Sequence, residues 1–169
     1  MSLLSGTIQG LFGKLFEKGR LDEISKLYRS LSSKFNDNFY LEIQRHGDQN
    51  EIAFEKFNLE QSLKIQIPII ATNEVYYLTP DMHEAHDALT CIGSKTYVNE
   101  KNRIKYSNQH YFKSNEEMSK LFSDLPEALE ITSIYHLNVI LDHSFQNPYF
   151  QILALKKEAV LMKYSKKIR

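Results

Sequence analysis

Two short apolar runs separated by a helical pattern constrain the fold of this chain most strongly. Residues 39–44 and 67–72 are rich in Ile, Phe and Tyr, and about one helix's worth of residues lies between them. The second run is almost unbroken in its apolar character, which is typical of a strand buried on both faces of a parallel sheet. The sequence therefore predicts an α/β fold, in which a parallel βαβ unit with flanking helices is followed by a helical segment.

A polar cluster follows each predicted strand. Residues 42–46 close the first run, and residues 72–74 close the second. In α/β folds, reactive groups and ligands gather at the carboxyl ends of the strands. We therefore expect these two clusters to lie where a functional site would be.

Helical patterns surround this unit. Apolar residues at helical spacing predict helices over residues 7–17, 21–34, 51–64, 81–92 and 127–137. Ser5 is the expected N-cap of the first helix, and Gly93 is expected to end the fourth. Residues 94–113 are polar and irregular, which predicts a loop. Ser114 and Glu117 then form a capping-box pattern, which predicts a further short helix.

Composition narrows the class of protein. The chain has 21 basic and 21 acidic residues, which does not indicate a dominant basic surface for nucleic acid. The single cysteine, Cys91, excludes an intramolecular disulfide and fits a reducing cytoplasm. No targeting signal is evident, and no segment approaches the ~20 consecutive apolar residues of a membrane span. We expect a soluble, cytoplasmic protein with no membrane partner.

The sequence around and after the predicted strand ends resembles that of one protein family. The chain reads Leu41-Glu42-Ile43-Gln44-Arg45-His46-Gly47, then Ala71-Thr72-Asn73-Glu74-Val75-Tyr76-Tyr77-Leu78, then His86-Asp87-Ala88-Leu89-Thr90-Cys91-Ile92. These phrases, in this order and at this spacing, are similar to the PHP (polymerase and histidinol phosphatase) domain of bacterial replicative DNA polymerase III alpha subunits. The resemblance extends from about residue 4 to about residue 130.

The resemblance implies a more specific architecture, a partial PHP-type (β/α) barrel. Residues 1–93 would form the C-terminal half of a PHP-like domain, and residues 94–137 a linker and helices that lead into the polymerase region. Residues 138–169 follow no family pattern. We expect a divergent tail there, and we attribute it to a frameshift.

The resemblance also implies a metal site, but the ligand motif is degenerate in this chain. The family's late metal motif is Asp-x-His, whose two side chains share one strand face because they are two residues apart. This chain has Glu74 and Tyr76 there. Glutamate keeps an oxygen ligand, whereas tyrosine does not readily replace an imidazole nitrogen. The family's early His-x-His motif is missing, so Glu74 is the candidate metal ligand. We expect no cofactor in this chain, Mg²⁺ for the parent polymerase and a divalent metal for an intact PHP site.

Three further side chains are weaker candidates for the site. Glu42 is either a site residue at a strand end or a structural acceptor, for example for Arg45. His46 precedes a glycine and fits a loop or helix-cap residue better than a ligand. His86 lies three residues after His83, whereas the zinc-binding H-E-x-x-H helix needs four, so we expect a surface or capping role.

The functional prediction follows from the family and from what the chain lacks. Nucleotidyl transfer needs paired acidic ligands that hold two Mg²⁺ ions about 4 Å apart, and no Asp-x-Asp pattern occurs in the sequence. We expect a fragment of the replicative DNA polymerase III alpha subunit with no catalytic residues of its own. Its partners would be other parts of that subunit or of the holoenzyme, and DNA only through the parent protein. Two alternatives stay open, a non-functional product of a broken gene and a PHP-type metal-dependent phosphoesterase module.

Overall fold

The described part of the chain is a mixed α/β structure. The computed structural model describes residues 2–141 of the 169-residue chain. The predicted divergent tail, residues 138–169, lies outside the described residues from residue 142 onward. None of the described helices is long and apolar enough to cross a membrane.

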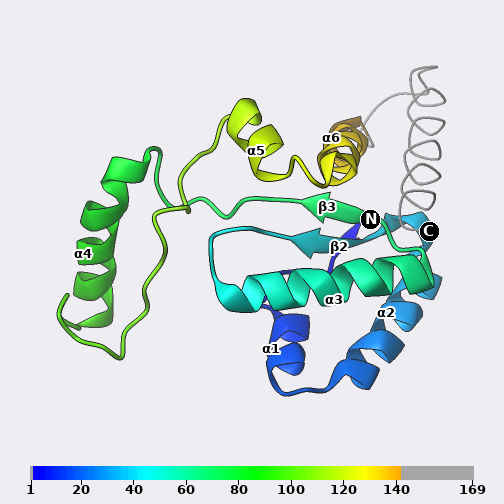
Figure 1. The fold of residues 1–169 in the computed structure, drawn as a ribbon, viewed down its shortest axis with the longest axis horizontal. Coiled ribbons are helices and arrows are strands. Elements are labelled where there is room, and N and C mark those ends of the chain that lie inside the picture. Colours follow the sequence, from blue (N-terminus) through cyan, green and yellow to red (C-terminus); the bar gives the residue numbers. More distant parts are fainter. Residues whose placement is uncertain (1, 142–169) are drawn as a thin grey trace.

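A small parallel sheet forms the centre of the fold (Figure 1). Its strands are β1 (Leu3–Leu4), β2 (Phe39–Ile43) and β3 (Ile69–Ala71), in the order β1-β2-β3. Both strand pairs are parallel, with Leu3 opposite Phe39 and Leu41 opposite Ile69. This arrangement confirms the predicted α/β class and the parallel βαβ unit.

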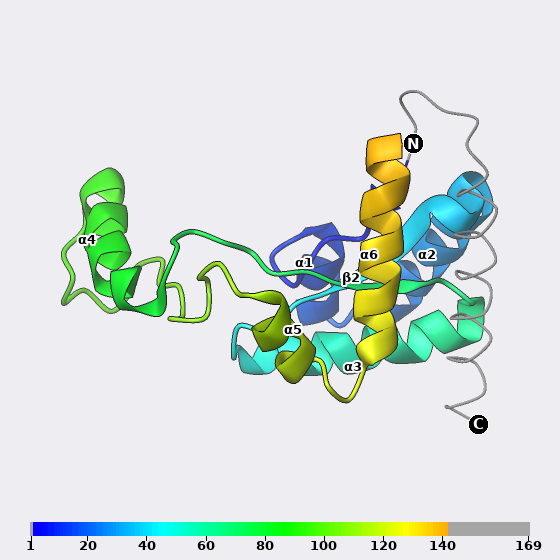
Figure 2. The same cartoon turned by 90° about the horizontal axis from the view of Figure 1, so that it is seen from above.

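Helices connect and cover the strands. Their bounds are α1 (Leu11–Glu17), α2 (Leu21–Phe35), α3 (Gln49–Ile65), α4 (His83–Ser94), α5 (Asn115–Leu121) and α6 (Pro126–Leu141), with short 3-10 helices η1 (Asn36–Asn38) and η2 (Pro80–Met82). Helices α1, α2 and α3 lie on one side of the sheet, and α6 crosses β3 on the other side (Figures 1 and 2). The predicted helices 21–34, 51–64 and 127–137 are therefore confirmed within a few residues.

Both faces of the sheet are buried, as its apolar strands predict. Phe39, Leu41 and Ile43 point into the main core with the rings of α1, α2 and α3. Tyr40 and Ile70 point to the opposite face. There they pack with the buried Ile131 of α6 and with Leu4 and Tyr135 at the margin of that cluster. Alternate residues of a strand face opposite sides, so one five-residue strand serves both cores.

Two capping predictions are wrong. Helix α1 begins at Leu11 behind Gly10, and no side chain caps it. The Ser5 hydroxyl instead accepts a hydrogen bond from the Glu42 backbone N–H at 3.0 Å, and it thereby joins the end of β1 to β2. Gly93 lies inside α4, whose last residue is Ser94 and whose C-cap, Lys95, has the left-handed conformation (φ 56°). An exposed helical glycine does not stop a helix when the following residues continue its hydrogen bonds.

Residues 80–106, which we call the arm, stand apart from the sheet and its covering helices (Figures 1 and 2). The arm contains η2, α4 and most of the predicted loop, and residues 95–113 contain no described helix or strand apart from a bridge between Tyr77 and Tyr111. Ser114 then caps α5 as predicted. Its side chain accepts from the Glu117 N–H at 3.2 Å, and the Glu117 carboxylate accepts from the Ser114 N–H at 2.7 Å.

Candidate functional site

A groove of about 640 Å³ opens at the carboxyl ends of β2 and β3. The arm joins the body there, the body being the sheet with its covering helices. Its lining comes from residues 7–9, from residues 44–51 after β2, from Glu74 and Tyr76 after β3, and from residues 104–110 of the loop. The polar clusters that follow the two strands in the sequence are thus brought together, because parallel strands end at the same edge of a sheet.

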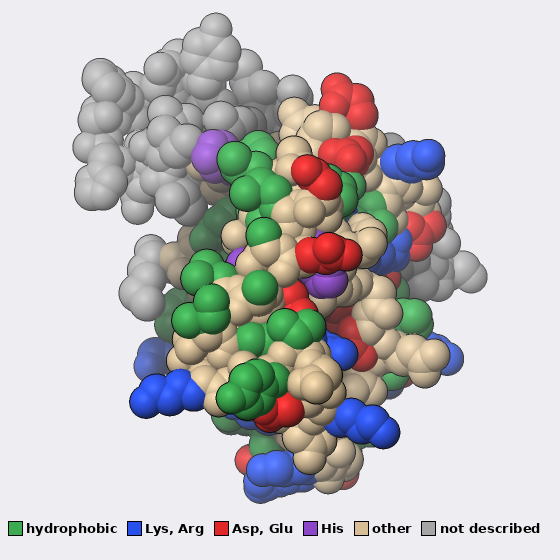
Figure 3. All heavy atoms as spheres, turned by 90° about the vertical axis from the view of Figure 1, so that its left-hand side faces the viewer, with side chains coloured by type: hydrophobic (Ala, Val, Ile, Leu, Met, Phe, Trp, Pro, Cys, Tyr) green, Lys and Arg blue, Asp and Glu red, His purple; other side chains and the backbone are tan. Residues whose placement is uncertain are grey.

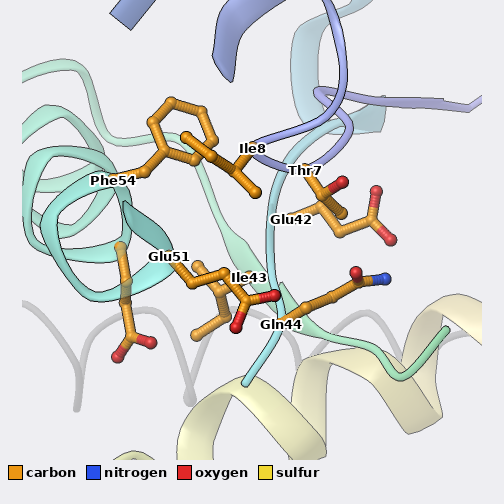
Figure 4. A pocket seen from close by; sticks show the side chains of 8 residues that line it. Thr7, Ile8, Glu42, Ile43, Gln44, Glu51 and Phe54 are labelled. Carbon is orange, nitrogen blue, oxygen red and sulfur yellow. The ribbon is translucent and has the colours of Figure 1, made fainter. Parts of the chain in front are cut away.

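A much smaller pocket of about 10 Å³ adjoins the groove, close to the space that one water molecule needs. Figure 4 shows Glu42 and Gln44 on one side of β2 and Ile43 on the other. Glu51 reaches into this pocket from the first turn of α3. The pocket is too small for a substrate.

Glu42 accepts a hydrogen bond between the two strand ends. The Thr72 hydroxyl donates to Glu42 Oε1 at 2.5 Å, and Gln44 Nε2 donates to Thr72 Oγ1 at 2.9 Å. Arg45 does not pair with Glu42. Its guanidinium binds Glu55 of α3 instead, with Nε 3.0 Å from Oε2. Of the two interpretations of Glu42, its contacts fit the structural acceptor.

Both ring nitrogens of the buried His46 are engaged. Nδ1 lies 2.9 Å from Glu51 Oε1, and Nε2 accepts the Glu74 backbone N–H at 3.3 Å. The neutral ring therefore carries its proton on Nδ1 and donates it to the carboxylate. The His46 backbone N–H also donates to Glu51 Oε2 at 2.7 Å. Burial acts to raise the pKa of Glu51, but the ring and backbone of His46 outweigh it and hold that pKa below its usual value.

These bonds give His46 a role at the start of α3. Asp48 is the N-cap of that helix, and Glu51 completes its capping box. The Glu51 carboxylate therefore binds both His46 and the backbone of the N-cap. No ring nitrogen of His46 is left to ligate a metal in this arrangement.

His110 is one of several groove residues from the loop that the sequence did not predict as site residues. Its ring stacks on that of His46, with centroids 3.9 Å apart and an interplanar angle of 9°. Nδ1 lies 3.1 Å from the Ser107 carbonyl, and Nε2 lies 3.8 Å from Glu74 Oε2. Burial and the neighbouring His46 lower the pKa of His110. Its segment has no periodicity and no motif, so no signal in the sequence singles it out.

Glu74 and Tyr76 bind each other rather than presenting free ligands. The Tyr76 hydroxyl donates to Glu74 Oε1 at 2.7 Å. Burial, together with this hydrogen bond to a carboxylate, raises the pKa of Tyr76. Tyr76 therefore stays a neutral phenol at ordinary pH, which is a poor metal ligand.

His86 lies on the arm and contacts aromatic rings. Its ring centroid is 5.3 Å from that of Tyr76 and 5.7 Å from that of Tyr106. On the same helix, His83 Nε2 lies 2.9 Å from the Tyr106 carbonyl. These contacts attach α4 to the mouth of the groove, and they do not bring His86 to Glu74.

The residues of the groove do not fit a metal centre of their own. Among residues 2–141, no group of three His, Cys, Asp or Glu side chains is placed to hold a metal ion. The candidate ligand Glu74 accepts the Tyr76 hydroxyl through one of its two carboxylate oxygens. The role of Glu74 as a metal ligand remains a prediction.

Comparison with curated proteins identifies relatives over most of the chain. This chain is 40% identical over 130 residues to a protein named DNA polymerase III subunit alpha from Caulobacter vibrioides. The match covers 77% of this chain and 11% of that protein. Proteins of the same name from Rickettsia bellii and Helicobacter pylori are 37% identical over 124 residues and 40% identical over 112 residues, covering 73% and 66% of this chain.

These relatives confirm the resemblance that the motifs predicted. The chain spans about a tenth of the length of the curated relatives that it matches. No protein-family model matches the chain.

Proposed function

We propose that this chain acts in DNA replication as a structural segment of a replicative polymerase. The premise is that it is homologous to part of the DNA polymerase III alpha subunits. The observation that carries the proposal is 34–40% identity to proteins of that name over most of the chain. The chain is not catalytic alone in this proposal. Its sequence has no Asp-x-Asp pair for nucleotidyl transfer.

The proposed architecture is a partial PHP-type barrel. Residues 1–93 form its C-terminal half, residues 94–137 lead into the polymerase region, and residues 138–169 form the divergent tail. The parallel β1-β2-β3 order with helical crossovers supports this proposal. At the outer edge of β3, Thr132 Oγ1 accepts the Ala71 N–H at 3.0 Å. Among the described strands β1 pairs with β2 alone, so further strands would add at the outer edge of β1.

The proposed partners are the other parts of an alpha subunit or of the polymerase III holoenzyme in the cytoplasm. DNA would be bound only through them. Mg²⁺ would serve the polymerase region of the complete subunit, and a divalent metal would require ligands from other segments beside Glu74. Neither is assigned to the residues of this chain alone.

A chimera tests the proposal. The matching segment of the Caulobacter vibrioides subunit is replaced by residues 2–141 of this chain, and primer extension on a primed template is measured. We expect the chimera to extend the primer and the isolated chain to extend none. A folded chimera without activity contradicts the proposal.

The same preparation of the isolated chain distinguishes the phosphoesterase alternative. It is incubated with p-nitrophenyl phosphate and Mn²⁺, and release of nitrophenol is followed. We expect no hydrolysis above the level of a Glu74→Gln variant. Hydrolysis that depends on Glu74 would favour the phosphoesterase module over the structural segment.

A further inference from the structure

Helix α4 exposes its apolar side to solvent. Four residues at positions i, i+3, i+4 and i+7 are exposed and form what we call the α4 stripe, namely Ala85, Ala88, Leu89 and Ile92. Leu89 is 65% exposed and Ile92 is 75% exposed. Apolar residues at this spacing lie along one side of a helix, and in a globular protein that side normally faces the core.

The polar side of α4 is turned inward instead. His83 and His86 contact the rings of Tyr77 and Tyr106, and Asp87 pairs with Arg103 at 2.5 and 2.8 Å. These bonds fix the rotation of α4 about its axis, so the α4 stripe cannot turn toward the body without breaking them. Figure 3, which views the molecule from the side of the arm, shows hydrophobic side chains gathered at this surface.

Charges of opposite sign border the α4 stripe at its two ends. Glu84 lies in the first turn of α4, and Lys95 follows its last residue. Both are exposed, and neither forms an ion pair with another described residue. At i and i+4, Glu84 and Ala88 follow one border of the stripe, and Lys95 is the left-handed C-cap residue just beyond its other end.

This order of charges suits a second copy of the same helix. In an antiparallel helix pair related by a two-fold axis, the same border of each helix faces its counterpart. Glu84 of one copy then lies near Lys95 of the other, twice over. The helix dipoles of such a pair also run in opposite directions. The two alanines of the stripe allow the helices to approach closely.

We propose that the α4 stripe is a self-association surface, through which two copies of this chain pair as antiparallel α4 helices. The paired residues are those of the stripe, with Glu84 and Lys95 forming reciprocal ion pairs at its ends. Such a contact is small by the standard of stable dimers, so the dimer forms in a concentration-dependent equilibrium. This inference is independent of the polymerase assignment.

Sedimentation equilibrium of the full chain tests the proposal. The apparent mass of the wild type is expected to rise from 19.8 kDa toward twice that value as concentration increases. Leu89→Glu and Ile92→Glu are expected to weaken association by about tenfold or more, since each places a charge in the apolar contact. Ile52→Glu serves as the matched control, because Ile52 is 68% exposed on α3, away from the α4 stripe.

Charge reversal distinguishes self-pairing from unspecific apolar association. Glu84→Lys and Lys95→Glu are each expected to weaken the dimer, because like charges would then meet. The double variant is expected to restore association, because the pairs re-form with exchanged sign. Circular dichroism of every variant checks that α4 remains helical.

Three results would overturn the proposal. The first is a wild type that stays monomeric at all concentrations, which would indicate that the α4 stripe pairs with a different polypeptide. The second is a dimer that Leu89→Glu and Ile92→Glu leave unchanged. The third is a double charge variant that associates no better than either single variant.

Discussion

The imidazole rings of His46 and His110 stack face to face at 3.9 Å, although one follows β2 and the other lies in the loop before α5. The Ser107 hydroxyl fixes the same junction, because it donates to the His46 carbonyl at 2.6 Å. Two cations cannot stack at this distance in a buried position without a large electrostatic cost. The stack therefore requires at least one neutral ring, and it makes the attachment of the loop sensitive to acid.

The stability of the chain is expected to fall as the pH drops below about 6.5, the ordinary pKa of histidine. The pKa of His110 is lowered in the folded state, so the folded state favours the neutral ring. The stabilising contribution is therefore present above the unfolded pKa and is lost as the pH falls toward the folded one. Urea unfolding at pH 7.5, 6.5 and 5.5 measures this change.

His110→Gln is expected to flatten that pH dependence, because glutamine does not titrate. His136→Gln is the control, since His136 is exposed on α6. Equal pH dependence in the wild type and in His110→Gln would show that the stacked pair does not govern acid stability.

Two glycine substitutions are expected to act in opposite directions. A Cβ at Gly13 of α1 would lie 1.9 Å from the Ile8 carbonyl oxygen, so Gly13→Ala should cost about 1–3 kcal/mol of unfolding free energy. A Cβ at Gly93 of α4 meets nothing within 4 Å, so Gly93→Ala should stabilise by about 0.5–1 kcal/mol. Thermal and urea unfolding measure both, and a neutral Gly13→Ala would show that the turn before α1 can move away.

Removal of the Arg45 side chain is expected to lower the unfolding free energy more than removal of any other charged side chain near the surface. Arg45 binds Glu55 and Asp124 with paired hydrogen bonds of 2.5–3.0 Å, and its guanidinium lies 4.6 Å from the Phe122 ring centre. Arg45→Ala should lower the unfolding free energy by about 2–3 kcal/mol, because Glu55 is left largely buried and unpaired.

Arg45→Lys should recover only part of that loss, since an ammonium cannot form the two-pronged pairs. Arg20→Ala is the matched control. Its partner Glu23 is 40% exposed, and exposed pairs contribute about 0–1 kcal/mol. Equal losses for Arg45→Ala and Arg20→Ala in urea unfolding would contradict the assigned role of Arg45.

Titration of the chain with Mn²⁺ or Zn²⁺ is expected to give no stoichiometric binding. The candidate ligand Glu74 is hydrogen-bonded to Tyr76, and His46 uses both ring nitrogens. Isothermal titration calorimetry measures the heat of binding for the wild type and for Glu74→Gln. A one-to-one isotherm that Glu74→Gln abolishes would establish Glu74 as a ligand and refute this prediction.

Local patterns predicted the elements whose signals are short in range. The capping box at Ser114 and Glu117 joins residues three apart, and the apolar composition of residues 39–43 marks a strand that is buried at every position but Glu42. The segments around His46 and Glu74, which resemble the family, pointed to the same strand ends that the structure brings together at the groove. These features depend on neighbours in the chain, so a sequence reveals them.

Ser5 and His110 show where such reasoning stops. Ser5 has the composition of a helix cap, yet it bonds the Glu42 N–H on β2, because the two-residue β1 pairs there. His110 has no local signal at all, and its role comes from stacking on a ring from another segment. Both roles depend on which segments meet in space, and that is decided by long-range packing rather than by spacing along the chain.

The sequence by itself determined the α/β class, the βαβ unit, the resemblance to DNA polymerase III alpha subunits and the degenerate motif at Glu74 and Tyr76, because each depends on residue type and short spacing. Only the tertiary structure decided that His110 completes the groove, that Arg45 joins α3 to the segment before α6, and that α4 turns its apolar stripe outward. The physical reason is that a helix has an apolar side in the sequence, but the bonds of its polar side, here those of His83, His86 and Asp87, decide which way that side faces.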